Sequence, residues 1–246
     1  IGKSVTMSSG GNRFGYTFAE ETQIVTSSPS GTITISSDMV NRITNVYNGG
    51  LWGNVLVSNF DGSLLITWNQ GQNHGIWLPV TFGAIWSVSF EWWVNSYGAD
   101  DMRFIFYAPN QPSSYSGSQH GGYNVLHEFY GGDSHAIITP TDSSLSTVNT
   151  TYPYNSTIPV TISYDNGVLT TIVGTSVNRS YTFTGSDLTA QQALWGTSTY
   201  IAISGRTGGV SANQYIKDID VTWDATTGYT STTKSQASIR DSVAGS

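Results

Sequence analysis

Charged side chains are so scarce in this sequence that long surface helices are nearly excluded. Only 10% of the 246 residues are Asp, Glu, Lys or Arg, whereas soluble domains usually have about a quarter. The chain has three Lys and four Glu, too few to build a solvated helical surface. Ser, Thr, Asn, Gln and Gly must therefore supply the polar surface, and these residues suit strands and turns. The composition predicts an all-β protein.

The charge balance and the absence of Cys exclude several classes of function. A net charge of −7 leaves no basic stripe for nucleic acid. Without Cys the chain has no disulfide framework, thiol catalysis or thiolate metal site. No apolar run is long enough for a membrane-spanning helix. The chain begins with Ile1 rather than Met, which fits either removal of a leader or an excised fragment.

A surface low in charge and rich in hydroxyl side chains favours an extracellular or cell-surface location. Asn-x-Ser/Thr triplets begin at Asn149, Asn155 and Asn178. In a chain this rich in Asn, Ser and Thr such triplets arise by chance, so they do not establish a glycoprotein.

Apolar runs recur along the chain and are separated by Gly, Asn, Asp, Ser and Pro, which predicts many short strands. The expected strands are Gly31–Ser36, Leu51–Val57, Ser63–Trp68, Trp86–Val94, Met102–Tyr107, Tyr123–Tyr130, Ala136–Thr139, Ser180–Thr184, Thr199–Ser204 and Ile216–Trp223. Val160–Val173 reads as a hairpin that turns at Asn166 and Gly167, since both residues tolerate positive φ. A helical turn is expected at Asp187–Leu194, where Ser186 or Asp187 can cap it.

This pattern predicts one β-sandwich or jelly roll of antiparallel sheets over residues 1–224, without repeats or linkers. Residues 225–246 are rich in Ser and Thr and cannot bury an apolar face. They read as a polar tail, and an ordered tail would have to be held by its own sheet or by a neighbouring subunit.

The order of several motifs resembles the L-type (legume) lectins of the concanavalin A-like superfamily. The stretches that carry the resemblance are Ser87–Phe90, Gly98–Phe104, Gly121–Tyr123, Val160–Asp165, Ser186–Leu188, Tyr200–Gly208 and Asp218–Trp223. They cover about residues 86–223, and their order rather than any single motif carries the match. The resemblance implies a concanavalin-like β-sandwich that binds sugar in a shallow depression built from four loops.

The resemblance also implies the residues that would bind carbohydrate. Carried over position by position they are Asp100, Gly122, Tyr130, Gly209, Val210, Ser211 and Asn213. A carboxylate can accept hydrogen bonds from two sugar hydroxyls, and an aromatic ring can stack on the apolar face of a pyranose. We expect these residues to converge at one end of the sandwich. The alternative for Asp100 and Asp101 is a solvated turn before a strand, and Asp101 stands where the family has Gly.

The family's metal site is only partly represented. Glu128 matches the family's Glu-Phe-Asp strand, but Tyr130 replaces the bridging Asp, which leaves Asp133 and His135 as the other candidate ligands. Three mixed ligands could hold one ion, whereas calcium prefers six to eight oxygens. The expectation is therefore sugar binding without a cofactor, with calcium as the alternative. The alternative is that Glu128 and His135 bind no metal and form hydrogen bonds with neighbouring hydroxyl groups.

Glycoside hydrolases share this fold class and need two carboxyl groups that flank the scissile bond. By strand alternation, Ser87, Ser89, Glu91 and Trp93 share one face, and Trp86, Val88, Phe90, Trp92 and Val94 share the other. The first set resembles a sugar-binding concave face, and Glu91 could face Glu128 across it. The signatures of these enzymes are absent, and the alternative is that Glu91 pairs with Arg103 on a polar face. No Gly-x-Ser-x-Gly elbow for a serine triad occurs.

Three functions follow from the sequence. The first is an extracellular lectin-like protein that binds carbohydrate or glycoconjugates non-covalently. The second is a structural subunit of a surface filament, layer or virion, which uses the fold as a scaffold and self-associates through its C-terminal tail. The third is a glycosidase that uses Glu91 and Glu128. Solution mass separates the first two, and a carboxylate pair facing one cleft would favour the third.

Overall fold

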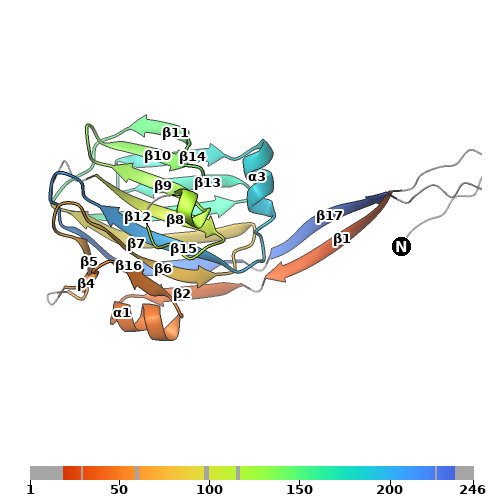
Figure 1. Cartoon of the computed structure of the whole chain (residues 1–246), viewed down its shortest axis with the longest axis horizontal. Coiled ribbons are helices and arrows are strands. Elements are labelled where there is room, and N and C mark those ends of the chain that lie inside the picture. Colours follow the sequence, from red (N-terminus) through yellow and green to blue (C-terminus); the bar gives the residue numbers. More distant parts are fainter. Residues whose placement is uncertain are drawn as a thin grey trace, which may run out of the picture. The chain divides into compact units, whose positions relative to one another are not determined.

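Two antiparallel sheets packed face to face make up most of this chain, as the sequence predicts (Figure 1). The computed structural model describes residues 19–28, 30–58, 61–96, 100–114, 117–224 and 226–235. The chain divides into two units, one of Thr26–Gly228 and one of Ile1–Val25 with Tyr229–Ser246. The first unit contains the sandwich. The motif residues Gly98 and Ala99 lie outside the described residues.

The seven-stranded sheet follows the order β11-β10-β9-β8-β15-β6-β3. Its strands are β11 (Ser144–Asn149), β10 (Ser134–Ile138), β9 (Tyr123–Glu128), β8 (Asp101–Ala108), β15 (Thr199–Arg206), β6 (Asn73–Val80) and β3 (Gly50–Trp52). Strands β8 and β15 are neighbours although nearly a hundred residues separate them in the chain.

The eight-stranded sheet follows the order β14-β13-β12-β7-β16-β5-β4, and β2 also pairs with β16. Its strands are β14 (Val177–Thr182), β13 (Val168–Val173), β12 (Thr157–Asp165), β7 (Ile85–Val94), β16 (Gln214–Trp223), β5 (Leu64–Thr67), β4 (Leu56–Val57) and β2 (Gly31–Ile35).

Helices are short, as the scarcity of charge predicts. They are α1 (Met39–Asn41), which continues into the π-helical η1 (Arg42–Val46), α2 (Gly117–His120) and α3 (Gly185–Gln192). The expected turn at Asp187–Leu194 is α3, which starts two residues earlier, with Thr184 at its N-cap. Among the described residues no helix is long and apolar enough to span a membrane.

The core lies between the two sheets and is rich in aromatic rings. In β7 the residues from Trp86 to Val94 alternate between buried and half-buried, so the predicted division of this strand into two faces is confirmed. The Trp86 indole stacks on Phe82 at 4.8 Å and on Tyr164 at 5.5 Å. Its Nε1–H donates to the Tyr107 hydroxyl at 3.1 Å, so its polar atom is satisfied.

The hairpin at residues 160–173 is confirmed. Asp165 pairs with Val168, and the turn residues Asn166 and Gly167 have φ values of 47° and 95°. Positive φ at both central residues is the requirement of a type I′ turn, which matches the twist of the flanking strands.

The strand predictions need correction at several places. The expected strand Leu51–Val57 is two strands in different sheets, β3 and β4, and between them Gly53 has φ 68°. Strands β6 and β11 are not among the expected strands, and β6 contains Gly75 and Pro79, which are uncommon inside strands. Pro79 is tolerated because β3 covers only the three residues from Gly75 to Trp77, so no strand on that side needs the missing N–H.

A two-stranded sheet of β1 (Ala19–Ser28) and β17 (Thr226–Ser235) lies mostly in the second unit. Strand β17 lies in the segment expected to be a polar tail. The sequence suggests two ways of holding an ordered tail, a sheet of its own or a neighbouring subunit, and β17 pairs with β1 in a sheet.

Candidate functional site

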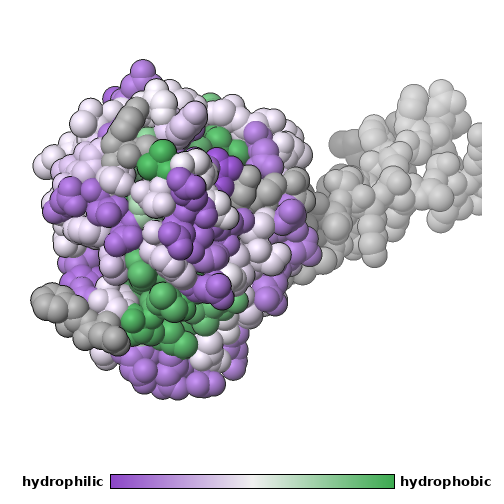
Figure 2. All heavy atoms as spheres, turned by 60° about the vertical axis from the view of Figure 1, so that its left-hand side comes forward, coloured by the Kyte–Doolittle hydropathy of each residue, from purple (hydrophilic) through white to green (hydrophobic). Residues whose placement is uncertain are grey.

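Strand register gathers the ends of β8, β9, β15 and β16 at one end of the sandwich, here called the loop end. Asp101, the first residue of β8, pairs with Glu128 at the end of β9 and with Arg206 at the end of β15. Figure 2 turns this end toward the viewer, and its surface is mostly hydrophilic or neutral, with a hydrophobic patch in the lower half. The loop end is where the residues expected to bind carbohydrate can meet.

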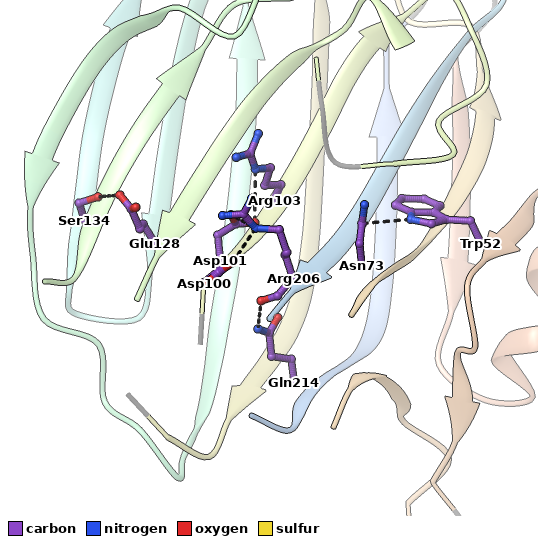
Figure 3. A network of polar contacts seen from close by, with 9 residues as sticks. All are labelled: Trp52, Asn73, Asp100, Asp101, Arg103, Glu128, Ser134, Arg206 and Gln214. Carbon is purple, nitrogen blue, oxygen red and sulfur yellow. Dashed lines mark hydrogen bonds and ion pairs between the residues drawn. The ribbon is translucent and has the colours of Figure 1, made fainter. Parts of the chain in front are cut away.

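Two carboxylates and two guanidinium groups form a chain of ion pairs at the loop end (Figure 3). Arg206 Nε lies 3.0 Å from Asp100 Oδ2 and 3.3 Å from Asp101 Oδ2. Arg103 Nε lies 3.3 Å from Asp101 Oδ1. Asp101 is 2% exposed, and burial raises its pKa, while both guanidinium groups act in the opposite direction. Asp100 is the more accessible carboxylate, with a side chain 16% exposed.

Asp100 packs directly on the backbone of the loop that follows β15. A Cβ placed on Gly208 would lie 2.6 Å from Asp100 Oδ1, so any larger residue here would force the carboxylate to shift. The loop expected to bind sugar, Gly209–Asn213, therefore starts next to Asp100. The structure thus brings Asp100 and the start of this loop together.

Hydrogen bonds from two sides hold this loop. Gln70 Nε2 donates to the Gly209 carbonyl oxygen at 2.7 Å, and Gly71 N donates to the Gly208 carbonyl oxygen at 3.0 Å. At its other end Asn213 N donates to Asn95 Oδ1 at 2.9 Å. A loop held in this way has little conformational entropy to lose when a ligand binds.

Tyr130 lies beside the same cluster. The backbone N–H of Phe129 donates to the Asp100 carbonyl oxygen at 2.9 Å, so the residue that follows it emerges near Asp100. The Tyr130 side chain is 66% exposed, among the most exposed of the large side chains described. An exposed ring near a carboxylate suits stacking on a sugar ring.

Gly122 does not belong to this cluster. Tyr123 pairs with Phe106 and Glu128 with Asp101, so Gly122 and Asp100 lie at opposite ends of the β8–β9 pair. Five residues of strand span about 17 Å. The Gly122 N–H donates to His120 Nδ1 at 3.0 Å, and a Cβ here would meet Ala108 at 2.8 Å. The expectation that all four loops converge is therefore wrong for Gly122.

The three candidate metal ligands are not brought together. Glu128 Oε2 accepts a hydrogen bond from Ser134 Oγ at 3.1 Å on the outer face of the seven-stranded sheet (Figure 3). Asp133 accepts from the Tyr152 backbone N–H at 2.7 Å and from the Tyr154 hydroxyl.

His135 is buried in the core, where its ring stacks on His127 at 5.3 Å. Strand alternation therefore places His135 and Glu128 on opposite faces of one sheet. Among the described residues no three His, Asp or Glu side chains gather as a metal site. Glu128, Asp133 and His135 therefore do not form a shared metal site.

The carboxylate pair expected of a glycosidase is also separated. Glu91 lies on the outer face of the eight-stranded sheet and Glu128 on the outer face of the seven-stranded sheet. Two outer faces of a sandwich point away from each other, so these carboxyl groups cannot flank one bond. Arg103 is not the partner of Glu91 either, since Lys217 Nζ lies 3.2 Å from Glu91 Oε2.

Sequence reasoning assigned no role to Arg206 or to three aromatic side chains on the outer face of the seven-stranded sheet. In the β3–β6 pair Gly50 lies opposite Trp77, and Trp52 lies opposite Gly75. A Cβ on Gly50 would lie 2.7 Å from Trp77, and one on Gly75 would lie 2.4 Å from Trp52, so each indole covers a glycine. Tyr200 packs edge-on against Trp77 at 5.4 Å. Recognising β6 as a strand would have revealed this arrangement.

Comparison with known proteins places the fold. No protein-family model and no curated protein matches this chain. Among solved structures, lectin UEA-II complexed with galactose superposes with a TM-score of 0.63 and 18% identity, over 79% of this chain and 99% of the lectin. Lectin II from Ulex europaeus gives 0.61 and 18%, over 78% and 97%.

The winged bean acidic lectin complexed with methyl-α-D-galactose gives a TM-score of 0.63 and 13% identity, over 82% of this chain and 99% of that lectin. Matches at such identities concern the fold alone. This chain therefore has a legume-lectin-like β-sandwich.

Proposed function

We propose that this protein is a lectin-like protein that binds carbohydrate non-covalently at the loop end of the sandwich. The observation that carries the proposal is the packing of the Asp100 carboxylate on Gly208, beside a hydrogen-bonded loop and the exposed ring of Tyr130. They are three of the four elements that the sequence resemblance implies, and their closeness supports the proposal.

Each element has a chemical role toward a sugar. The Asp100 carboxylate can accept hydrogen bonds from two neighbouring hydroxyls, and its ion pair with Arg206 fixes its position. The backbone and the Ser211 and Asn213 side chains of the loop supply further polar groups. Tyr130 offers an aromatic face for the apolar side of the ring. Because the rigid sandwich holds the carboxylate, the loop and the tyrosine, sugar binding costs little conformational entropy.

Galactosides are the first ligands to test. Two proteins of similar fold are described as complexes with galactose and methyl-α-D-galactose. The candidate metal ligands do not form a site here, so we propose that the sugar binds without a metal. The low charge and the hydroxyl-rich composition support an extracellular or cell-surface location.

A glycan array probed with and without EDTA tests this function, followed by titration of the best sugar into Asp100→Asn. The substitution keeps the shape but removes the charged acceptor, so the affinity should fall by about ten- to a hundredfold. Asp220→Asn is the matched control, because Asp220 is an exposed carboxylate in β16 of the other sheet. Absence of binding to any glycan, or equal binding by Asp100→Asn, would contradict the proposal.

A second function, a structural subunit of a surface assembly, is supported by the β1–β17 sheet. An isolated two-stranded sheet is marginally stable in water, and both of its edges have unpaired backbone groups. Pairing with the same strands of another copy would satisfy them. The solution mass of the full chain, measured by light scattering over a range of concentrations, tests this: discrete oligomers support it and a monomer throughout rejects it.

A further inference from the structure

A cavity of about 390 Å³ opens on the outer face of the eight-stranded sheet. This volume lies in the range of small-molecule sites, which is roughly 300–1,000 Å³. The lining residues that matter here are Asp61, Ser63, Glu91, Trp93, Tyr215 and Lys217. No residue of the loop-end cluster contributes to it.

Strand register builds the floor of this cavity. In the β7–β16 pair Trp93 lies opposite Tyr215, and Glu91 lies opposite Lys217. Alternation directs all four side chains outward, because the residue between them in β7, Trp92, is buried in the core. The two aromatic rings pack edge-on with centroids 5.2 Å apart, and Lys217 Nζ lies 3.2 Å from Glu91 Oε2.

Asp61 and Ser63, which precede β5, supply a polar wall. Asp61 Oδ1 accepts hydrogen bonds from Ser63 Oγ at 2.6 Å and from Ser63 N at 3.1 Å. The hydrogen bond from Ser63 lowers the pKa of Asp61, and the hydrogen bond to Glu91 raises the pKa of Lys217. At neutral pH the wall therefore presents a carboxylate and the floor presents an ammonium group.

We propose that this cavity is a second carbohydrate site, which binds one neutral hexopyranose unit of a glycan. The lining combines an aromatic floor for the apolar face of the ring, carboxylates that accept hydrogen bonds from hydroxyls, and an ammonium group that donates to them. The cavity lies on the outer face of the eight-stranded sheet, whereas Asp100 and Tyr130 adjoin strands of the seven-stranded sheet. One sandwich therefore carries two separate sugar sites and can link two glycan chains.

The mixed lining argues against other small ligands. An anion would face the carboxylates of both Asp61 and Glu91, and an apolar ligand would remove water from three charged groups without offering them a hydrogen bond. A simple cation would be repelled by Lys217, which already neutralises Glu91. A neutral polyhydroxylated ring uses the donor, the acceptors and the aromatic rings together.

An NMR titration of the 15N-labelled full chain tests the proposal. The probes are methyl galactoside, methyl glucoside and methyl mannoside at millimolar concentration, with tetramethylammonium as the cation probe. At least one glycoside should shift the Trp93 indole signal and the backbone signals of Glu91 and Lys217. Trp93→Ala should weaken this response about tenfold. Ile172→Ala should leave it unchanged, since Ile172 is an exposed apolar residue, 40% exposed, in β13 of the same sheet.

Two conservative variants keep the test valid if Trp93→Ala disturbs the fold. Lys217→Gln and Glu91→Gln retain the shape of the floor, and each should weaken the cavity response roughly three- to tenfold. Asp100→Asn should weaken the response at Tyr130 and spare the cavity, which separates this inference from the loop-end function. A response to tetramethylammonium alone, no response to any glycoside at the cavity, or wild-type affinity in both conservative variants would overturn the proposal.

Discussion

The Asp100 carboxylate packs so closely on Gly208 that a methyl group added at position 208 would lie only 2.6 Å from Asp100 Oδ1. This contact joins the start of β8 to the loop after β15, two segments more than a hundred residues apart in the chain. It fixes the position of the carboxylate that we propose as the sugar acceptor, and it can be tested without altering that carboxylate.

Gly208→Ala should push the Asp100 carboxylate away from the loop and weaken sugar binding about tenfold or more. Overpacking of this kind also costs about 1–3 kcal/mol of stability, although a side-chain end can move and keep the cost low. Asp220→Asn, at an exposed position in β16 of the other sheet, is the control and should bind the glycan like the wild type. Isothermal titration with the best glycan compares the two, and equal affinities would contradict a role for Asp100 in this position.

Arg206→Gln should destabilise the protein because it leaves the buried Asp101 carboxylate with Arg103 alone. We expect a loss of about 2–3 kcal/mol in the free energy of unfolding, less than for a fully buried pair because the Arg206 side chain is 31% exposed. Arg179→Gln, at an exposed position in β14, is the control and should change little.

The loss in Arg206→Gln should grow as the pH rises. Burial already raises the folded-state pKa of Asp101 above its unfolded value, and removal of a guanidinium group raises it further. The folded state then retains its proton over a pH range in which the unfolded state has released it, so stability falls as the pH rises through that range. Urea unfolding at pH 4 and pH 7 should show the larger loss at pH 7; an equal loss would contradict this account.

Acid should destabilise the sandwich through its buried histidines. Desolvation lowers the pKa of His135 from 6.5 to about 4, and it lowers the pKa of His127 as well. Below pH 6.5 the unfolded chain takes up protons that the folded protein excludes, so stability falls as the pH drops toward 4. For His135 alone the loss over this window is about 3 kcal/mol.

His135→Phe should reduce this acid dependence, since a phenyl ring can occupy the same apolar site and stack on His127. The measurement is urea unfolding at half-unit steps from pH 7 to pH 4. If the slope of stability against pH is the same in the variant and the wild type, His135 is not a source of the acid sensitivity.

Removal of metal should change neither stability nor sugar binding. Glu128, Asp133 and His135 each have separate surroundings and do not converge on one point. Thermal melting and glycan binding are measured before and after dialysis against EDTA. A lower melting temperature that calcium restores would show that this protein does hold an ion.

The sequence by itself determined the fold class and much of the local structure. Scarcity of charge excluded long helices, alternation in β7 identified which side chains enter the core, and Asn166–Gly167 fixed a tight hairpin. These predictions succeed because they rest on properties of residues close together in the chain. Where local signals conflicted, as with Gly75 and Pro79 in β6, a strand was missed although neighbouring strands stabilise it.

Only the tertiary structure decided which distant residues meet. The register of β8 against β9 carried Gly122 away from Asp100, and the register of β8 against β15 placed Arg206 on both carboxylates. Assignment of β7 and β9 to different sheets separated Glu91 from Glu128. A shift of one residue between strands reverses the face that every side chain occupies, and residues far apart in the chain carry no local signal of that register. The site depends on this pairing, whereas the fold class depends on composition and pattern.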